Sequence, residues 1–249
     1  MDMSGNTILV TGGASGIGRR LAEVFHARGN TVIIASRRRS ALDAVVAADP
    51  GLIAMELDVA DPASIAAFSA EILAHHPDLN VVLHNAGIMR RENLAAGDWL
   101  ATSEAIVATN LLGPIRLTEA LLPHLLTRPK AAILTVTSGL AFVPSTWFPT
   151  YSATKAGLHS WTQALRRQLR DASVEVVEIA PPYVQTELTG AHQAVDPRAM
   201  PLEDYIAETV SLLSSTPTPA EVIVERCRPL REAERSGAFE QIFEAIAAS

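Results

Sequence analysis

Cysteine, aromatic residues and charge are all scarce in this 249-residue sequence. The single cysteine, Cys227, has no partner for an internal disulfide, and no group of Cys and His residues has zinc-site spacing, so we expect neither disulfides nor a bound metal. Lys and Arg number 20 against 27 Asp and Glu. The resulting net charge of −7 argues against a protein that binds nucleic acid through its phosphate backbone.

Long hydrophobic runs are also missing. The apolar stretch 111–126 is interrupted by Pro114, Arg116 and Glu119, and no basic-then-apolar signal opens the sequence. A membrane span needs about 20 predominantly apolar residues. We therefore expect no membrane association and a cytoplasmic protein.

Strand-like and helix-like segments alternate along the chain. The apolar segments that indicate strands are residues 7–11, 31–35, 52–57, 80–84, 131–137 and 174–179, and those that indicate helices are residues 17–28, 38–48, 62–75, 98–126 and 151–170. This alternation predicts an α/β fold: a Rossmann-type, doubly wound, mainly parallel sheet of six to seven strands with helices on both faces. The absence of a long linker favours one domain over residues 1–249.

A glycine-rich turn, residues 11–18 (TGGASGIG), follows the first predicted strand and begins the first predicted helix. Glycines let the backbone approach a pyrophosphate closely, and the free N–H groups of the helix start favour its negative charge. A plain glycine turn is the alternative. Its position after the first strand favours dinucleotide binding.

The end of the second predicted strand selects between the two nicotinamide cofactors. A carboxylate there would bind the 2′-hydroxyl of NAD(H), but the sequence has Ser36, Arg37, Arg38 and Arg39. Guanidinium groups bind phosphate with charge-assisted hydrogen bonds. The sequence favours NADP(H) over NAD(H), the alternative being a solvated basic helix start.

Tyr151 and Lys155 lie four residues apart on a predicted helix and so share one face. A tyrosine with its ordinary pKa of about 10 needs a shift of about 3 units to act as an acid and base near neutrality, and a nearby ammonium lowers that pKa. Ser138 ends the preceding strand, at the edge where parallel sheets bind ligands. Its hydroxyl would hold a carbonyl oxygen to which the phenol delivers a proton.

With these motifs in this order, the sequence resembles the short-chain dehydrogenase/reductase family, in its compact single-domain branch, from about residue 8 to residue 188. The resemblance implies a catalytic set of Asn110, Ser138, Tyr151 and Lys155, in which Asn110 holds a water; a lone asparagine that binds a neighbouring carbonyl is the alternative for Asn110. The implied cofactor contacts are Gly12, Ser15, Gly16, Ile17, Gly18, Ser36, Arg37, Arg38, Asp58, Val59, Asn85, Ala86, Gly87, Tyr151, Lys155, Pro181, Val184 and Thr186.

The implied reaction is hydride transfer between the nicotinamide and a small-molecule carbonyl or secondary alcohol, with Tyr151 as general acid and base. The alternative is a regulatory protein of the same fold that binds the dinucleotide without turnover. Substrate specificity is expected from the loop after Ser138 and from the segment 187–215. The expected substrate contacts are Ser138, Leu140, Trp147, Tyr151, Tyr183, Leu188 and His192.

Some segments depart from the general family pattern. The runs 138–144 (SGLAFVP) and 180–182 (APP) resemble a DltE-type subgroup, and Pro182 stands where the family usually has glycine. His84 stands where the family often has asparagine, and we expect a buried, hydrogen-bonded core histidine. The C-terminal segment 216–249 is atypical, with a strand or a short helix at 221–226, so either a homodimer or a homotetramer is expected.

Overall fold

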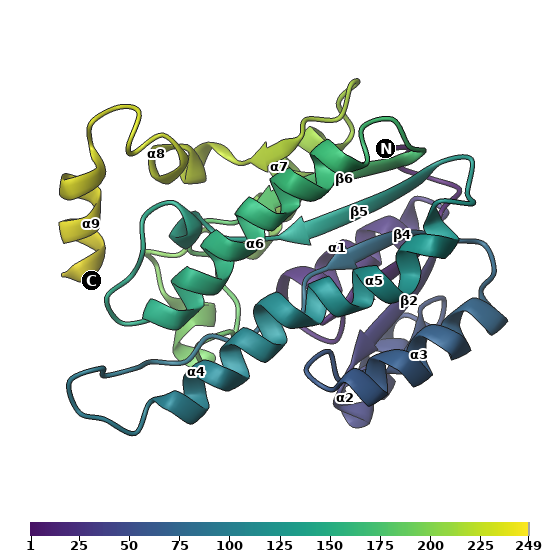
Figure 1. Ribbon diagram of the computed structural model, residues 1–249, viewed down its shortest axis with the longest axis horizontal. Helices are drawn as coiled ribbons and strands as arrows, with labels where there is room; N and C mark the ends of the chain where they lie inside the picture. Colours follow the sequence, from purple (N-terminus) through teal and green to yellow (C-terminus); the bar gives the residue numbers. More distant parts are fainter. Residues whose placement is uncertain (249) are drawn as a thin grey trace.

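The computed structural model describes residues 1–248 and contains a seven-stranded sheet (Figure 1). The strands are β1 (Thr7–Thr11), β2 (Thr31–Ser36), β3 (Ile53–Glu56), β4 (Leu79–His84), β5 (Ala131–Val136), β6 (Val174–Ala180) and β7 (Glu221–Ile223). They lie in the order β3-β2-β1-β4-β5-β6-β7, and all neighbouring pairs are parallel. The predicted Rossmann-type fold is confirmed, and the sheet, predicted as mainly parallel, is parallel throughout.

Both faces of the sheet are buried, which explains why the strands read as continuous apolar runs. Successive residues of a strand face opposite sides. In β1, Ile8 and Val10 belong to the hydrophobic core on one side, and Leu9 belongs to the core on the other. All six residues of β5 are buried.

Helices cover the two faces, as Figure 1 shows. Phe25, Leu42 and Tyr205 bring three helices onto the face of Ile8, and Phe68, Leu121 and Leu165 bring three others onto the face of Leu9. The first three are α1 (Gly16–Ala27), α2 (Arg39–Ala48) and α7 (Leu202–Leu213), and the second three are α3 (Pro62–His75), α5 (Gly113–Leu125) and α6 (Pro149–Gln168).

Two helix boundaries follow directly from local chemistry. The Asp61 carboxylate accepts a hydrogen bond from the backbone N–H of Ala63 at 2.9 Å, and Pro62 takes the first position of α3. Gly29 lies just past α1 with φ of +81°, the left-handed conformation that ends helices. Asp61 and Pro62 therefore fix the start of α3, and Gly29 fixes the end of α1.

The predicted helix 98–126 is divided in the structure. It consists of α4 (Leu100–Val107), a π-helical turn at Ala108–Leu112, and α5. The whole stretch Leu100–Leu125 has the length and hydropathy of a membrane span, although 44% of the most apolar part is buried inside the molecule. Buried core helices meet the same criteria, so the absence of a membrane span stays a prediction.

The atypical C-terminal segment contains both of the structures left open for residues 221–226. β7 completes the edge of the sheet, and a 3₁₀ turn at Glu225–Cys227 follows it. Two further helices are α8 (Arg228–Arg231) and α9 (Phe239–Ala247). In Figure 1, α9 stands at the margin of the molecule, and all of its residues are at least partly exposed.

Candidate active site

The residues predicted to bind cofactor and substrate follow the carboxyl ends of parallel strands. Residues 11–18 follow β1, residues 85–87 follow β4, Ser138 follows β5 and residues 181–186 follow β6. Because the strands are parallel, these ends share one edge of the sheet. From β1 the chain continues to β2 and β3 on one side, and after β3 it crosses to β4 on the other side of β1. Ligands bind where the strand order reverses in this way.

Ser138 and Tyr151 lie together at this edge. Ser138 is extended, with φ of −172°, and begins a 3₁₀ turn at Gly139–Ala141; its Oγ accepts a hydrogen bond from the N–H of Leu140 at 3.1 Å. Tyr151 lies in the first turn of α6, with its phenol close enough to the Ser138 side chain for Ser138 to affect its pKa. Both side chains are buried. The hydroxyl pair is therefore held in a place from which most water is excluded.

Burial controls the acidity of Tyr151 and Lys155. Desolvation raises the pKa of the phenol to about 12, against a smaller lowering effect of the Ser138 hydrogen bond. Burial lowers the pKa of the Lys155 ammonium to about 8, against the charge of Glu178. The predicted lowering of the Tyr151 pKa by Lys155 is not seen, because an ammonium with a pKa of about 8 has lost its proton before a phenol with a pKa of about 12 titrates. At neutral pH the ammonium is charged; its Nζ donates to the carbonyl of Val136 at 2.7 Å and lies 5.6 Å from the centre of the phenol ring.

Asn110 lies in the π-helical turn and is fully buried. Its Oδ1 accepts from the N–H of Ile88 at 2.8 Å and its Nδ2 donates to the carbonyl of Ile88 at 2.9 Å. The structural role kept open for Asn110 is therefore present. A Cβ on Gly87 would lie 3.4 Å from Asn110 Oδ1 and 3.8 Å from Lys155 Nζ, so Asn110 and Lys155 border one space beside Gly87.

Asn85 holds the glycine-rich turn against the end of β4. Its Nδ2 donates to the carbonyls of Thr11 at 3.0 Å and Gly12 at 3.3 Å. A Cβ on Gly18 would lie 2.2 Å from that Nδ2, and Gly12 has φ of +67°. Asn85 and the glycines fit together so closely that larger residues at positions 12 and 18 would displace the turn.

The start of α1 fits an anionic group. Ser15 is the N-cap residue but makes no side-chain capping bond, which leaves its hydroxyl and the first N–H groups of the helix, beginning at Gly16 and Ile17, for another acceptor. Gly16 has φ of +53°, and a Cβ there would lie 3.5 Å from Thr186. The β1 turn and the β6 loop thus face each other.

The basic residues after β2 divide into two kinds. Arg37 and Arg38 are exposed, and no residue within 1–248 forms an ion pair with either. Arg39 instead lies 2.8 Å from Asp43 on α2. The Ser36 hydroxyl accepts from the N–H of Arg38 at 3.3 Å. Two free guanidiniums, rather than the three that the sequence indicates, are available for a phosphate.

The predicted adenine contacts lie after β3. The carboxylate of Asp58 accepts from the N–H of Ala60 at 2.9 Å, which fixes the turn that carries Val59. Val59 is buried against α5, where a Cβ on Gly113 would lie 2.8 Å from the Val59 carbonyl oxygen. These contacts orient both residues, and their role toward adenine stays a prediction.

The loop after β6 is held by a residue that the sequence analysis missed. Gln193 is buried, and its Nε2 donates to the carbonyl of Val184 at 2.8 Å and to the Thr186 hydroxyl at 3.0 Å. Pro181 accepts from the N–H of Gly139 at 2.8 Å, which links this loop to the turn after Ser138. A single glutamine nine residues downstream gives no local sequence signal.

The predicted substrate contacts are less closely gathered. Leu140 lines an apolar hollow between α6 and Phe243 of α9, outside the group of Ser138 and Tyr151. Trp147 is stacked under the guanidinium of Arg91, 3.9 Å from its ring centre. Three others lie on the β6 loop: Tyr183, which donates to Asp196 at 3.2 Å, exposed Leu188, and His192, which lies 3.3 Å from the Thr189 hydroxyl.

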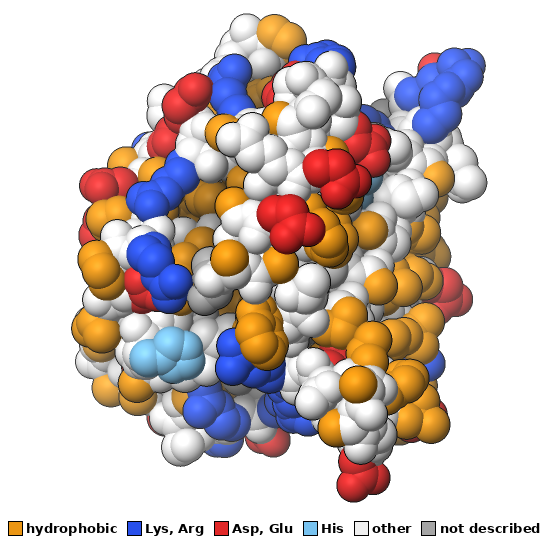
Figure 2. Space-filling model, turned by 90° about the vertical axis from the view of Figure 1, so that its left-hand side faces the viewer, with side chains coloured by type: hydrophobic (Ala, Val, Ile, Leu, Met, Phe, Trp, Pro, Cys, Tyr) orange, Lys and Arg blue, Asp and Glu red, His pale blue; other side chains and the backbone are white. Residues whose placement is uncertain are grey.

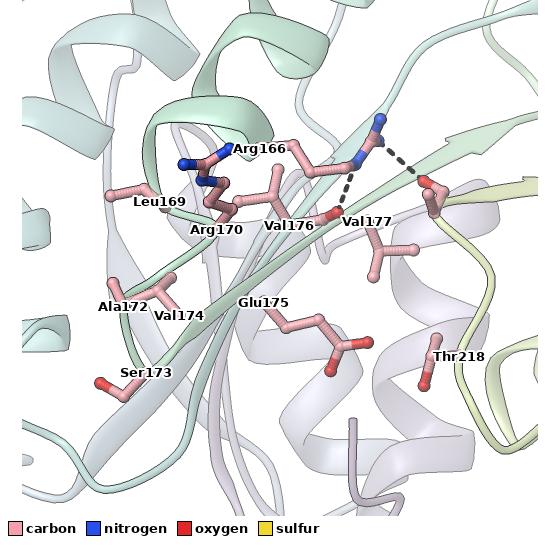
Figure 3. A pocket seen from close by; sticks show the side chains of 11 residues that line it. Arg166, Leu169, Arg170, Ala172, Ser173, Val174, Glu175, Val176, Val177 and Thr218 are labelled. Carbon is pink, nitrogen blue, oxygen red and sulfur yellow. Dashed lines mark hydrogen bonds between the residues drawn. The ribbon is translucent and has the colours of Figure 1, made fainter.

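An open hollow of about 370 Å³ lies at the other end of β6, between α6 and the segment before β7. Figure 3 shows its lining, with Arg166 donating to the carbonyls of Val176 and Ala220, both at 2.8 Å. It contains none of the predicted site residues and lies at the amino end of the strand. We therefore do not assign it to the reaction.

His84 and a second, partly buried histidine have different partners. His84 is hydrogen-bonded to the Thr118 hydroxyl at 2.8 Å, and complete burial lowers its pKa to about 4. The predicted buried, hydrogen-bonded core histidine is confirmed. His159 lies 2.8 Å from the carboxylate of Glu178 on β6. This His–Glu pair was not predicted from the sequence, because nothing local connects residues 159 and 178.

Comparison with known proteins agrees with this arrangement. The family model described as short chain dehydrogenase matches residues 6–196. The chain is 38% identical over 248 residues to a Bacillus subtilis protein named uncharacterized oxidoreductase DltE, covering 98% of this chain and 97% of the relative.

Two solved structures share the fold and differ in the bound cofactor. One is a short-chain dehydrogenase from Sphingobium yanoikuyae in complex with NADPH, with TM-score 0.80, 25% identity, and coverage of 97% and 94% of the two chains. The other is a 3-ketoacyl-(acyl-carrier-protein) reductase from Brucella melitensis complexed with NADH, with TM-score 0.79, 26% identity, and coverage of 91% and 100%. The family model, the full-length relative and the fold together show that the chain belongs to the short-chain dehydrogenase/reductase family of nicotinamide-dependent oxidoreductases.

Proposed function

We propose that the protein is an NADP(H)-dependent carbonyl reductase or alcohol dehydrogenase that acts on a small molecule through Tyr151. The observation that carries this proposal is the buried group at the sheet edge: Ser138 beside the phenol of Tyr151, with Lys155 one helical turn further along α6. Binding a dinucleotide alone does not require such a group. Perturbed acidities in a buried cluster are typical of catalytic sites.

The residues at the sheet edge fit a nicotinamide dinucleotide. The uncapped start of α1 at Gly16 would take the pyrophosphate, and the space beside Gly87 would take the nicotinamide ribose next to Lys155. Pro181, Val184 and Thr186 would border the nicotinamide. When bound, the cofactor supplies or accepts the hydride.

The preference for NADP(H) rests on Arg37 and Arg38. Both are exposed at the end of β2, where the 2′-position of the adenosine ribose is expected, and neither is paired within residues 1–248. Two like charges without partners next to each other favour an anion. A 2′-phosphate provides it with bidentate geometry.

In the direction of reduction, the side chains have separate tasks. Ser138 donates to the substrate carbonyl oxygen and orients it toward Tyr151. Tyr151, whose phenol is protonated at neutral pH, donates its proton to that oxygen. Lys155 then favours the phenolate through its positive charge. Asn110 fixes the loop at Ile88 beside them.

The test is cofactor oxidation with a panel of ketones and aldehydes. We expect the wild-type protein to oxidise NADPH with at least one of them, and Tyr151→Phe to lower kcat by about 10³-fold, within the range for loss of a general acid. Tyr205→Phe removes a phenol hydroxyl from the core under α7 and serves as the matched control, with activity within twofold of wild type. Equal activity in Tyr151→Phe would contradict the proposal. Tight NADPH binding without turnover would favour the regulatory alternative.

We also propose that the protein works in the cytoplasm as a homodimer or homotetramer. Leu100 and Leu126, at the two ends of the long α4–α5 stretch, are 61% and 46% exposed. Figure 2 shows hydrophobic side chains with few charges along the lower part of the picture's right-hand edge, on the side that faces the viewer in Figure 1. Light scattering after gel filtration should give two or four times 26.6 kDa; a mass of one chain at micromolar concentration would contradict it.

A further inference from the structure

A buried carboxylate paired with a partly buried histidine lies behind the candidate active site. The Glu178 side chain on β6 is fully buried, and its two carboxylate oxygens lie 3.0 and 2.8 Å from Nδ1 of His159. The Thr137 hydroxyl donates to one of these oxygens at 2.6 Å. A buried carboxylate lowers stability unless hydrogen bonds and opposite charge compensate it. Because the Glu178 carboxylate needs these compensating partners, we infer that it has a role beyond packing.

Each partner of Glu178 is next to a residue of the site. Thr137 directly precedes Ser138, and its N–H donates to the carbonyl of Ile179 at 2.9 Å. His159 lies one turn after Lys155 on the same face of α6. Glu178 therefore connects the strand end that carries Ser138 with the helix that carries Lys155.

The charge of Glu178 also acts on Lys155. The Lys155 ammonium is buried, and its hydrogen bond goes to the Val136 carbonyl, which carries no formal charge. An ammonium in this position loses its proton readily unless an anion is near. Val136 is followed by Thr137, whose hydroxyl donates to the Glu178 carboxylate at 2.6 Å. The charge of Glu178 is therefore near Lys155, where it favours the protonated ammonium.

We propose that Glu178 is a positioning residue for the reaction of the proposed function, on which this inference rests. Through Thr137 and His159 it fixes Ser138 and Lys155 relative to each other. Its buried negative charge keeps the Lys155 ammonium protonated at neutral pH, the state in which lysine favours the phenolate of Tyr151.

The other charged groups in this region are already compensated. Glu221 is the β7 neighbour of Glu178 in the sheet, and Arg231 of α8 binds it at 2.7 Å. His159, Glu178 and Glu221 bring ligand atoms within 4.8 Å of one another, but Thr137 and Arg231 occupy the two carboxylates, which favours a hydrogen-bonded network over a metal site. The titratable groups around Glu178 and its partners are His159, Lys155 and Arg166 of α6, Glu221 of β7, Cys227 of the 3₁₀ turn, and Arg231.

The test compares Glu178→Gln with Glu221→Gln, which removes the same charge from the adjacent strand. Two properties are measured: the pH dependence of kcat for ketone reduction, and the pH dependence of Lys155 acetylation by mass spectrometry, which needs no turnover. Removing the anion lowers the pKa of Lys155, so both midpoints should move down by about one pH unit in Glu178→Gln. At pH 8 this corresponds to a loss of activity of about fivefold, with a much smaller loss at pH 6. Glu221→Gln should keep both midpoints.

A loss of activity that is equal at all pH values, with unchanged Lys155 acetylation, would overturn the proposal and make Glu178 a purely structural residue. If Glu178→Gln does not fold, Glu178→Asp keeps the charge but withdraws it by one methylene, and a smaller shift in the same direction is expected; no shift overturns the proposal. If the wild-type protein turns over no carbonyl, the proposed function fails. The acetylation midpoints then still decide whether Glu178 controls the Lys155 proton.

Discussion

Exclusion of water controls the acidity of individual side chains at the sheet edge. Tyr151 and Lys155 are buried, and their pKa values move in opposite directions, to about 12 and about 8. Each shift favours the uncharged form. The phenol therefore has its proton ready for a carbonyl oxygen, and Lys155 titrates close to neutral pH, where a nearby anion has a large effect on its charge.

Arg37→Ala should separate the two cofactors. Loss of a guanidinium bound to the 2′-phosphate costs about 1.5–3 kcal/mol, so the Kd for NADPH should rise roughly 10- to 100-fold while the Kd for NADH changes less than twofold. Fluorescence titration of both cofactors measures this. Arg39→Ala is the control, because Arg39 is already paired with Asp43. Equal losses for NADPH and NADH would show that Arg37 does not face the phosphate.

Sequence reasoning reaches those site residues whose signals are local. The spacing of Tyr151 and Lys155 and the position of Ser138 after a strand can be read within one short window. Gln193 and the His159–Glu178 pair cannot, because their partners come from other elements and only the packed structure brings them together. The predicted lowering of the Tyr151 pKa is not seen for the same reason: burial, which raises this pKa, is a property of the fold.

Among the elements, the strands and helices were predictable because each contains its own apolar pattern. α3 begins and ends at the predicted residues, since Asp61 and Pro62 mark its start. The π-helical turn at Ala108–Leu112 was not predicted, because one extra residue per turn leaves the hydrophobic pattern almost unchanged. That turn carries Asn110, so the irregular part of the element belongs to the site.

Asp61→Ala should destabilise α3 at its first turn. Loss of the hydrogen bond from the Ala63 N–H lowers the free energy of unfolding by about 1 kcal/mol. Urea unfolding followed by circular dichroism measures this. Glu71→Ala, an exposed acidic position in the same helix, should change the free energy by less than about 0.5 kcal/mol. The cap has no role if both variants behave alike.

Asn85→Ala should loosen the turn between β1 and α1. Without the bonds to the carbonyls of Thr11 and Gly12, the turn loses its fixed shape, and the Kd values for NADPH and NADH should rise together by roughly fivefold, about 1 kcal/mol. Asn80 joins β4 to β1 at the amino ends of these strands, where it accepts a hydrogen bond from the N–H of Thr7 at 2.9 Å. Asn80→Ala should lower stability and leave both Kd values unchanged; weaker cofactor binding in this control would count against the assignment.

For the molecule as a whole, a buried histidine of the sheet makes the free energy of unfolding depend on pH. His84 is buried between the sheet and α5, and its pKa of about 4 lies below the ordinary 6.5. Between these values the unfolded chain binds a proton that the folded one does not, so this contribution is complete above pH 6.5 and is lost as pH falls toward 4. The contribution of His84 to the free energy of unfolding is at most roughly 3 kcal/mol.

The free energy of unfolding in urea at pH 7.5 and pH 5 tests this contribution. We expect wild type to lose more stability between the two pH values than His84→Asn, by about 2 kcal/mol. His75→Asn, at the exposed end of α3, is the control and should keep the wild-type difference. An equal loss in wild type and His84→Asn would mean that His84 is protonated in the folded protein.

Because the sheet is strictly parallel, the loops at the carboxyl ends of the strands and the loops at their amino ends lie on opposite sides of the molecule, and their sequences can change independently. Substrate range can diverge between relatives through the loops at the carboxyl ends, while the loops at the amino ends, such as residues 127–130 between α5 and β5, stay outside the chemistry. Those loops are the places for a fluorophore, an affinity tag or a short inserted peptide. A label there would report on folding and assembly while turnover continues undisturbed.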